Sequence, residues 1–98
     1  MDTEIVLHRI VAEKAALVER GVESLSLFGS RARGDARSDS DFDFAVRLDP
    51  HRIIGGFGFV DIEMELARIA GTPIDLVAEP ARKPRMQAEI DRWRRRVF

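Results

Sequence analysis

The sequence has no cysteine, which excludes disulfide bonds, thiolate zinc sites and a cysteine nucleophile. Its two histidines, His8 and His51, are too few for a histidine-rich metal site. No apolar run approaches the roughly 20 residues that span a bilayer, and the acidic N-terminus lacks the basic start of a secretory signal. These absences favour a cytoplasmic protein that does not enter a membrane.

The length and composition favour one small globular domain over residues 1–98. The chain has 98 residues, of which 45% are hydrophobic and 34% charged. A chain of this length buries roughly 60–65% of the surface that its unfolded form exposes. That is enough for one core between two layers of secondary structure and leaves no room for a second domain.

The charges are unevenly distributed along the chain, although the net charge is only −1. Residues 1–79 hold nine Lys/Arg and fifteen Asp/Glu, whereas residues 80–98 hold seven and two. An acidic stretch of net charge −6 therefore precedes a basic tail of net charge +5. The tail is expected either to meet an acidic partner or to form an amphipathic helix with a solvated, arginine-rich face.

Apolar residues at a spacing of three to four predict a helix over 3–20, capped by Thr3 and ended by Gly21. The alternation in 24–28 predicts a strand, and a polar loop follows at 34–40. A second alternating strand is expected at 42–46, with Phe42, Phe44 and Val46 on one face.

The second half of the chain continues this pattern. A glycine-rich loop is expected at 55–59, a helix from there to Ala70, and a short third strand at 73–78. After Pro84 a last helix is expected to carry Met86, Ile90, Trp93 and Val97 along one apolar stripe. This order predicts an α/β (α+β) fold in which helices pack on a small mixed β-sheet.

The most informative segment is LFGSRARGDARSDSDFDFAV, residues 27–46. Gly29 and Ser30 follow directly after the first predicted strand, where a glycine permits a sharp turn and close approach of a ligand. If the next residues open a helical turn, their N–H groups and the Ser30 hydroxyl could hold an anion. A plain turn at this place is the simpler alternative.

Asp41 and Asp43 add a pair of carboxylates at the start of the second strand, where residues two apart project from the same face. Aspartate is disfavoured inside an apolar strand, but paired carboxylates suit hard divalent cations such as Mg²⁺. Asp75 is a third carboxylate in an apolar strand. If the strands are neighbours, all three carboxylates would converge near the Gly29–Ser30 turn, as in two-metal phosphoryl transfer.

These residues resemble the signature of the nucleotidyltransferase superfamily that is related to DNA polymerase beta. The spacing of Gly29, Ser30, Asp41 and Asp43, together with the short chain and the later I-D-L-V, is similar to the minimal nucleotidyltransferase (MNT) family in particular. The likeness runs from about residue 20 to 80. It implies a polymerase-beta-like nucleotidyltransferase fold.

The resemblance also implies roles for individual residues. Gly29 and Ser30 would contact the β- and γ-phosphates of ATP, and Asp41 and Asp43 would bind both of two Mg²⁺ ions. Asp75 would bind the catalytic metal and help to deprotonate the attacking hydroxyl. Arg33, in the Ala-Arg-Gly that the family shares, would either contact the phosphates or brace the loop.

Many MNT proteins are antitoxins paired with a HEPN-type RNase toxin, and some transfer AMP from ATP to a tyrosine hydroxyl of that toxin. The resemblance therefore implies an adenylyltransferase antitoxin in a hetero-oligomer with its toxin. The lack of long apolar runs argues against a membrane role, and the single small domain argues for a protein acceptor over RNA, so direct nucleic-acid binding is not expected. One alternative is a nucleotidyltransferase acting on small, aminoglycoside-like molecules. Another is an antitoxin that acts by binding alone. Phe57 and Phe59 lie beside three glycines and could stack on an adenine, although Phe59 fits the core face of the following helix equally well.

Overall fold

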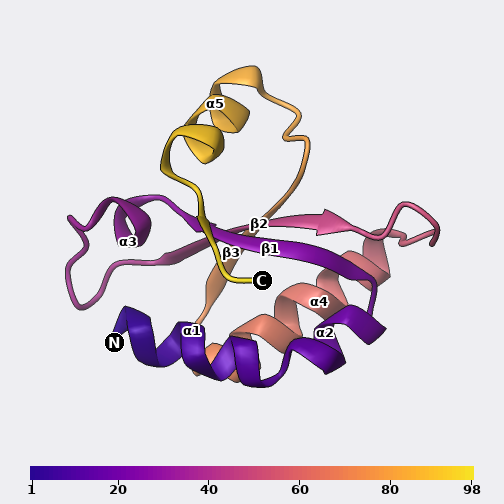
Figure 1. The fold of residues 1–98 in the computed structure, drawn as a ribbon, viewed down its shortest axis with the longest axis horizontal. Helices are drawn as coiled ribbons and strands as arrows, with labels where there is room; N and C mark the ends of the chain where they lie inside the picture. The colour runs from indigo at the N-terminus through magenta and orange to yellow at the C-terminus, as the bar shows by residue number, and fades with distance from the viewer.

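The structure is a computed structural model that describes residues 1–98, and it consists of one mixed sheet with helices on both faces (Figure 1). The elements in chain order are α1 (Thr3–Ala12), α2 (Lys14–Glu19), β1 (Val22–Phe28), α3 (Ser30–Arg33), β2 (Phe42–Leu48), α4 (Gly56–Ala70), β3 (Ile74–Ala78), α5 (Pro84–Trp93) and β4 (Arg95–Arg96). No helix is long and apolar enough to cross a membrane.

The strands lie in the order β3-β2-β1-β4. β1 pairs antiparallel with β2 on one side and with β4 on the other. β2 and β3 are parallel, because the chain crosses back along α4 between them. The predicted fold class, helices on a small mixed sheet, is confirmed.

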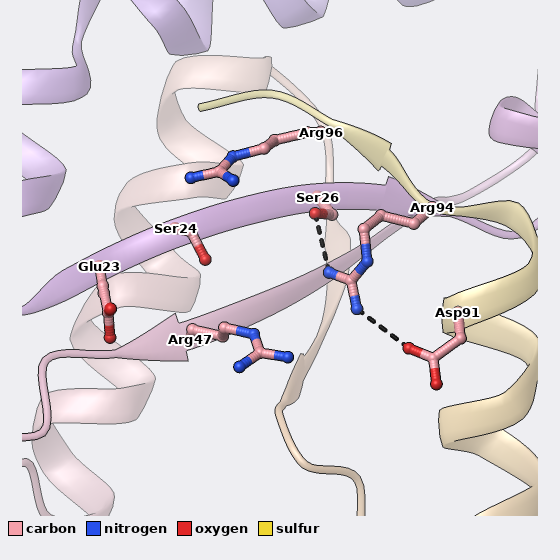
Figure 2. A pocket seen from close by; sticks show the side chains of 7 residues that line it. All are labelled: Glu23, Ser24, Ser26, Arg47, Asp91, Arg94 and Arg96. Carbon is pink, nitrogen blue, oxygen red and sulfur yellow. Dashed lines mark hydrogen bonds and ion pairs between the residues drawn. The ribbon is translucent and has the colours of Figure 1, made fainter.

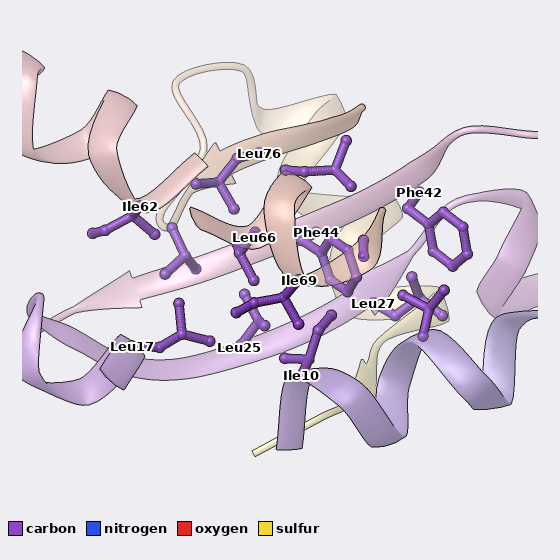
Figure 3. Close-up of a cluster of buried hydrophobic side chains, with 14 of the residues drawn as sticks. Ile10, Leu17, Leu25, Leu27, Phe42, Phe44, Ile62, Leu66, Ile69 and Leu76 are labelled. Carbon is purple, nitrogen blue, oxygen red and sulfur yellow. The ribbon is translucent and has the colours of Figure 1, made fainter. Parts of the chain in front are cut away.

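The main core lies between one face of the sheet and the helices α1 and α4 (Figure 3). β2 shows how the sequence builds it: Phe42, Phe44 and Val46 are buried in this core, as their alternation predicts. Ile10 and Leu66 reach the same cluster from the helices. The residues between them on β2 therefore face the other side of the sheet.

That second face is covered only in part, by α5 (Figure 1). Ile90 of α5 is fully buried there against Phe28 and Ala45, in a small second cluster. Both ends of this sheet face, on either side of α5, remain accessible as hollows. The cleft that contains the predicted site residues is one of them.

The predicted helix over 3–20 is interrupted. Glu13, with φ −103° and ψ 15°, separates α1 from α2. The sequence has no proline or glycine at this position from which the break could be predicted. The cap of α1 is Asp2 rather than Thr3, because the Asp2 side chain accepts a hydrogen bond from the Ile5 N–H at 3.1 Å. The stop expected at Gly21 is confirmed, since Gly21 separates α2 from β1.

Two further boundaries differ from the predictions. α4 begins at Gly56, so most of the expected glycine-rich loop is helical. The last helix ends at Trp93, and Arg95–Arg96 instead add a short strand to β1. Val97 therefore does not continue the stripe of α5 but packs against the main core on the opposite face of the sheet.

Candidate active site

The turn after β1 is shaped by a close contact between Gly29 and Asp43. Gly29 has φ 74° and ψ −159°, a backbone conformation that is essentially restricted to glycine. A β-carbon at this position would overlap the Asp43 carboxylate oxygen Oδ2 and lie 3.1 Å from its Cγ. The glycine thus allows the backbone to approach the carboxylate, and Ser30 then starts α3 directly above the strand ends.

Two of the three predicted carboxylates are direct neighbours. Asp43 of β2 and Asp75 of β3 are register partners in the parallel pair, so their side chains project from the same face of the sheet. Phe28, the last residue of β1, is the register partner of Asp43 on its other side. The site therefore lies at the end of β1 and the start of β2 and β3.

The electrostatics of Asp43 differ from those of an ordinary surface carboxylate. Burial, followed by the charges of Asp75 and Asp41, raises the pKa of Asp43 from 3.8 to about 6. Arg33 opposes this shift only weakly. Clustered carboxylates with unrelieved repulsion are typical of a site that gains a cation or a proton when it works.

These residues line a cleft of about 580 Å³, a size found for small-molecule sites. It collects five of the six predicted site residues, two further glutamates and several apolar side chains. The lining consists of Phe28, Gly29, Ser30, Arg33, Asp43, Glu63, Asp75, Leu76, Val77, Met86 and Glu89.

Asp41 is the predicted residue that the cleft does not include. It precedes β2, lies in the loop and is exposed, so the same-face rule for strand residues does not apply to it. Its charge still acts on Asp43. The expected convergence of three carboxylates is thus confirmed for two of them, and the structure has no group of three acidic or histidine side chains placed to hold a metal.

The donor set nevertheless fits Mg²⁺. This ion prefers oxygen ligands and is commonly bound by one or two carboxylates, while waters and substrate phosphates complete its shell. Asp43 and Asp75 offer such a pair, and the absence of a side chain at Gly29 lets the Asp43 carboxylate lie directly against the backbone of the turn. A protein cage with more ligands is not required.

Arg33 lies at the cleft and is held by two acidic neighbours. Its Nε is 3.3 Å from Asp35 Oδ2 and its Nη1 is 3.4 Å from Glu89 Oε1 of α5. The ion pair between Arg33 and Glu89 joins α3 to α5. Glu89 and Glu63 were not singled out from the sequence, because a glutamate on a polar helix face gives no signal of a site.

Arg31 is a third residue that sequence reasoning does not identify. Its guanidinium is almost fully buried and donates to the carbonyl oxygens of Ser40 (2.8 Å), Ser38 (3.2 Å) and Met1 (2.5 Å). It also stacks over the Phe42 ring, 4.2 Å from the centroid. Arg31 therefore ties the loop that leads to Asp41 onto α3 and the N-terminus.

The remaining candidates lie away from the cleft. Phe57 is 96% exposed on α4 and Phe59 packs against the main core, and neither lines the cleft. The expected adenine stacking is therefore wrong in this structure, and the expected core position is right for Phe59. His8 and His51 are exposed outside the cleft as well.

Comparison with known proteins agrees with this geometry. The model of the family described as "Nucleotidyltransferase domain" matches residues 9–97. The protein adenylyltransferase MntA of Thermococcus cleftensis is 37% identical over 75 residues, which cover 76% of this chain and 74% of that protein.

Solved structures give the same result. A structure described as a minimal nucleotidyltransferase superposes with a TM-score of 0.78 and 29% identity, over 97% of this chain and 95% of the other. A complex of a tri-AMPylated Shewanella oneidensis HEPN toxin with its MNT antitoxin matches in fold at a TM-score of 0.66 and 15% identity, over 94% and 71% of the two chains. The chain therefore belongs to the nucleotidyltransferase family and is a homologue of the MntA protein adenylyltransferase.

Proposed function

We propose that this protein is a Mg²⁺-dependent adenylyltransferase antitoxin that transfers AMP from ATP to a tyrosine hydroxyl of a HEPN-type toxin. The observation that carries the proposal is the register pairing of Asp43 with Asp75 beside the Gly29–Ser30 turn, within one cleft. The similarity to MntA supports a protein as the acceptor.

In this mechanism the chain positions the triphosphate and accepts a proton. Gly29 and Ser30 hold the β- and γ-phosphates, and Arg33 leaves Glu89 to add positive charge at the same end. The acceptor oxygen forms a bond to the α-phosphorus while the bond to the bridging oxygen breaks. Pyrophosphate leaves with the electron pair, and the hydroxyl proton passes to Asp75.

Asp43 and Asp75 would hold Mg²⁺, which when bound neutralises the negative charge of the phosphates. Asp41 would join them through the loop that Arg31 secures. The raised pKa of Asp43 means that cation binding displaces a proton at about pH 6. Toxin modification and toxin binding are both consistent with an antitoxin, but only modification uses this charge arrangement.

The test is transfer of label from ATP labelled at the α-phosphate to the toxin, in the presence of Mg²⁺. We expect Asp75→Asn and Asp43→Asn to reduce transfer at least about 100-fold, because a positioned proton acceptor or charge is lost. Asp61→Asn is the matched control, since Asp61 is an exposed carboxylate on α4 outside the cleft.

Three outcomes would contradict the proposal. Stable toxin binding without any label would favour an antitoxin that acts by binding alone. Label on an aminoglycoside in preference to the toxin would favour the small-molecule alternative. Transfer at the wild-type rate by either cleft variant would remove the assigned carboxylates from the mechanism.

A further inference from the structure

The second hollow on the α5-bearing sheet face lies on the other side of α5 from the cleft, and Figure 2 shows the side chains that line it. We call it the arginine pocket and define it by Ser24, Ser26, Arg47, Arg94 and Arg96. Its volume is about 460 Å³ and none of its lining residues is hydrophobic. The predicted activity of the cleft makes no use of it.

The hollow results from the strand register. Ser24 of β1 is the register partner of Arg47 on β2, and Ser26 is the partner of Arg96 on β4. Two small side chains on the central strand are thus flanked by two long ones on its neighbours. The next residue of β1 on this face after Ser26 is Phe28. Its ring packs against Ile90 of α5, and this contact closes the hollow.

The guanidinium of Arg94 is already bound by other side chains of this protein. Its guanidinium binds both carboxylate oxygens of Glu79 and donates to Ser26 Oγ at 3.1 Å and to Asp91 Oδ1 at 3.2 Å. The Glu79 side chain is only 1% exposed, and its bond to Arg94 lowers its pKa, so this ion pair persists. Arg94 therefore forms a fixed wall of the pocket.

By contrast, the guanidinium N–H groups of Arg47 and Arg96 make no hydrogen bonds within the protein. The Arg47 side chain is 58% exposed, and its nearest acidic contact is Glu79 at 3.9 Å, already bound by Arg94. Arg96 makes no ion pair at all. Besides Asp91, which Arg94 and Gln87 engage, the pocket has one acidic residue, Glu23. Arg47 and Arg96 lie on the two strands that flank β1, so an anion above Ser24 and Ser26 can receive N–H donors from both sides.

The type of anion follows from the donors. Backbone N–H groups in a sheet lie in its plane and pair with neighbouring strands, so this face offers no backbone nest of the kind that holds phosphate. What it offers is two guanidinium forks and the serine hydroxyls, which match carboxylate and phosphate oxygens alike, so the missing backbone nest is what favours carboxylate side chains. The absence of apolar lining disfavours an apolar peptide segment.

We propose that the arginine pocket binds acidic side chains of a protein partner, and this inference rests on the proposed function in that the partner is the acceptor protein. The pocket and the cleft open on the same sheet face and are separated only by α5. A partner that places Asp or Glu residues between Arg47 and Arg96 would lie across α5. Its acceptor hydroxyl would then be held near Asp75.

The test uses a fluorescent hexaglutamate peptide and anisotropy, without ATP or toxin. We expect Arg47→Gln and Arg96→Gln each to weaken peptide binding about five- to tenfold, because each removes a charged fork from an exposed position. Arg82→Gln, an exposed arginine of the same basic tail that does not line the pocket, is expected to change the affinity less than twofold. The thermal melts of all three variants should match the wild type.

Equal weakening by all three variants would overturn the proposal, because it would indicate general attraction to the basic tail. Displacement of the peptide by pyrophosphate at a lower concentration than the unlabelled peptide requires would also overturn it, because the pocket would then prefer phosphate to carboxylate. The peptide measurement needs no transfer reaction, so failure of adenylylation leaves it intact. Absence of peptide binding, in turn, leaves the assignment of the cleft untouched.

Discussion

Asp43 combines three constraints in one side chain. It occupies a strand position whose neighbours Phe42 and Phe44 form the core, it lies against the Gly29 backbone, and it faces Asp75. Its charge is therefore costly in the cation-free protein. A group of this kind makes stability depend on pH in a direction opposite to that of a salt-bridged aspartate.

The pKa of Asp43 predicts the sign of this dependence. Because the folded value of about 6 exceeds the ordinary 3.8, folding favours the protonated form. Its contribution to stability is complete below about pH 4 and is lost as the pH rises through 6. The full shift corresponds to about 3 kcal/mol, and partial solvent exposure reduces this to about 1–2 kcal/mol.

Asp43→Asn should consequently be more stable than the wild type above pH 6, by about 1–2 kcal/mol, and nearly equal to it at pH 4. Urea unfolding between pH 4 and 8, in the presence of a chelator, measures this difference. Asp39→Asn, in the exposed loop, is the control that leaves the site unchanged. A variant less stable than the wild type at pH 7 would instead indicate an aspartate held by hydrogen bonds to its charged form.

At the scale of elements, Arg31 explains how an irregular loop holds its shape. Four acceptors in two segments receive its N–H groups: Met1 and Thr3 at the N-terminus, and Ser38 and Ser40 in the loop before β2. None of the four is a carboxylate. The guanidinium fork fits because its donors are fixed in a plane, which a lysine cannot reproduce.

Arg31→Lys should therefore destabilise the protein by about 2–3 kcal/mol, since one ammonium group cannot reach all three carbonyls and the Thr3 hydroxyl. Hydrogen exchange should increase most in residues 34–41. Arg37→Lys, in the same loop but without side-chain bonds to the protein, serves as control for the urea midpoint. Identical midpoints for the two variants would show that the Arg31 contacts add nothing to the fold.

The elements also differ in how well the sequence predicts them. β2 is recognisable because its core residues alternate strictly, and this alternation also places Asp43 on the functional face. β4 is not, because two arginines carry no strand pattern and pair only because the edge of β1 is free. Arg31 escapes sequence reasoning for a related reason: its burial depends on carbonyl groups that only the folded loop brings together.

At the scale of the whole molecule, the sheet separates stability from chemistry. One face carries the main core with α1 and α4, and the other carries α5, the arginine pocket and most of the cleft, whose lining extends past the edge strand β3 to Leu76 and to Glu63 of α4. The pairing of Asp43 with Asp75 could be anticipated from two apolar strands that each contain one carboxylate. The position of α5 between two hollows could not, since it depends on Ile90 alone among its residues being fully buried.

Ligand binding to the cleft should stabilise the entire domain. With Mg²⁺ and ATP at a hundredfold excess over the dissociation constant, the wild type should gain roughly 2.7 kcal/mol, or several degrees in Tm. Asp75→Asn should gain much less, although its exposed side chain contributes little to the fold of the free protein. Thermal melts with ATP alone, Mg²⁺ alone and both together measure this, and equal gains for both proteins would separate Asp75 from the ligand.

The alternation along β2 has a consequence for how such a protein could acquire a new acceptor. On this strand Asp43 of the cleft lies between the core residues Phe42 and Phe44, so replacing this stretch would alter the packing together with the chemistry. α5 contributes Met86 and Glu89 to the cleft and Asp91 to the arginine pocket, yet only Ile90 to the buried clusters. Replacing the residues of α5 other than Ile90 should thus change which acceptor is bound, while the strands keep the packing of the core and the positions of the cleft carboxylates.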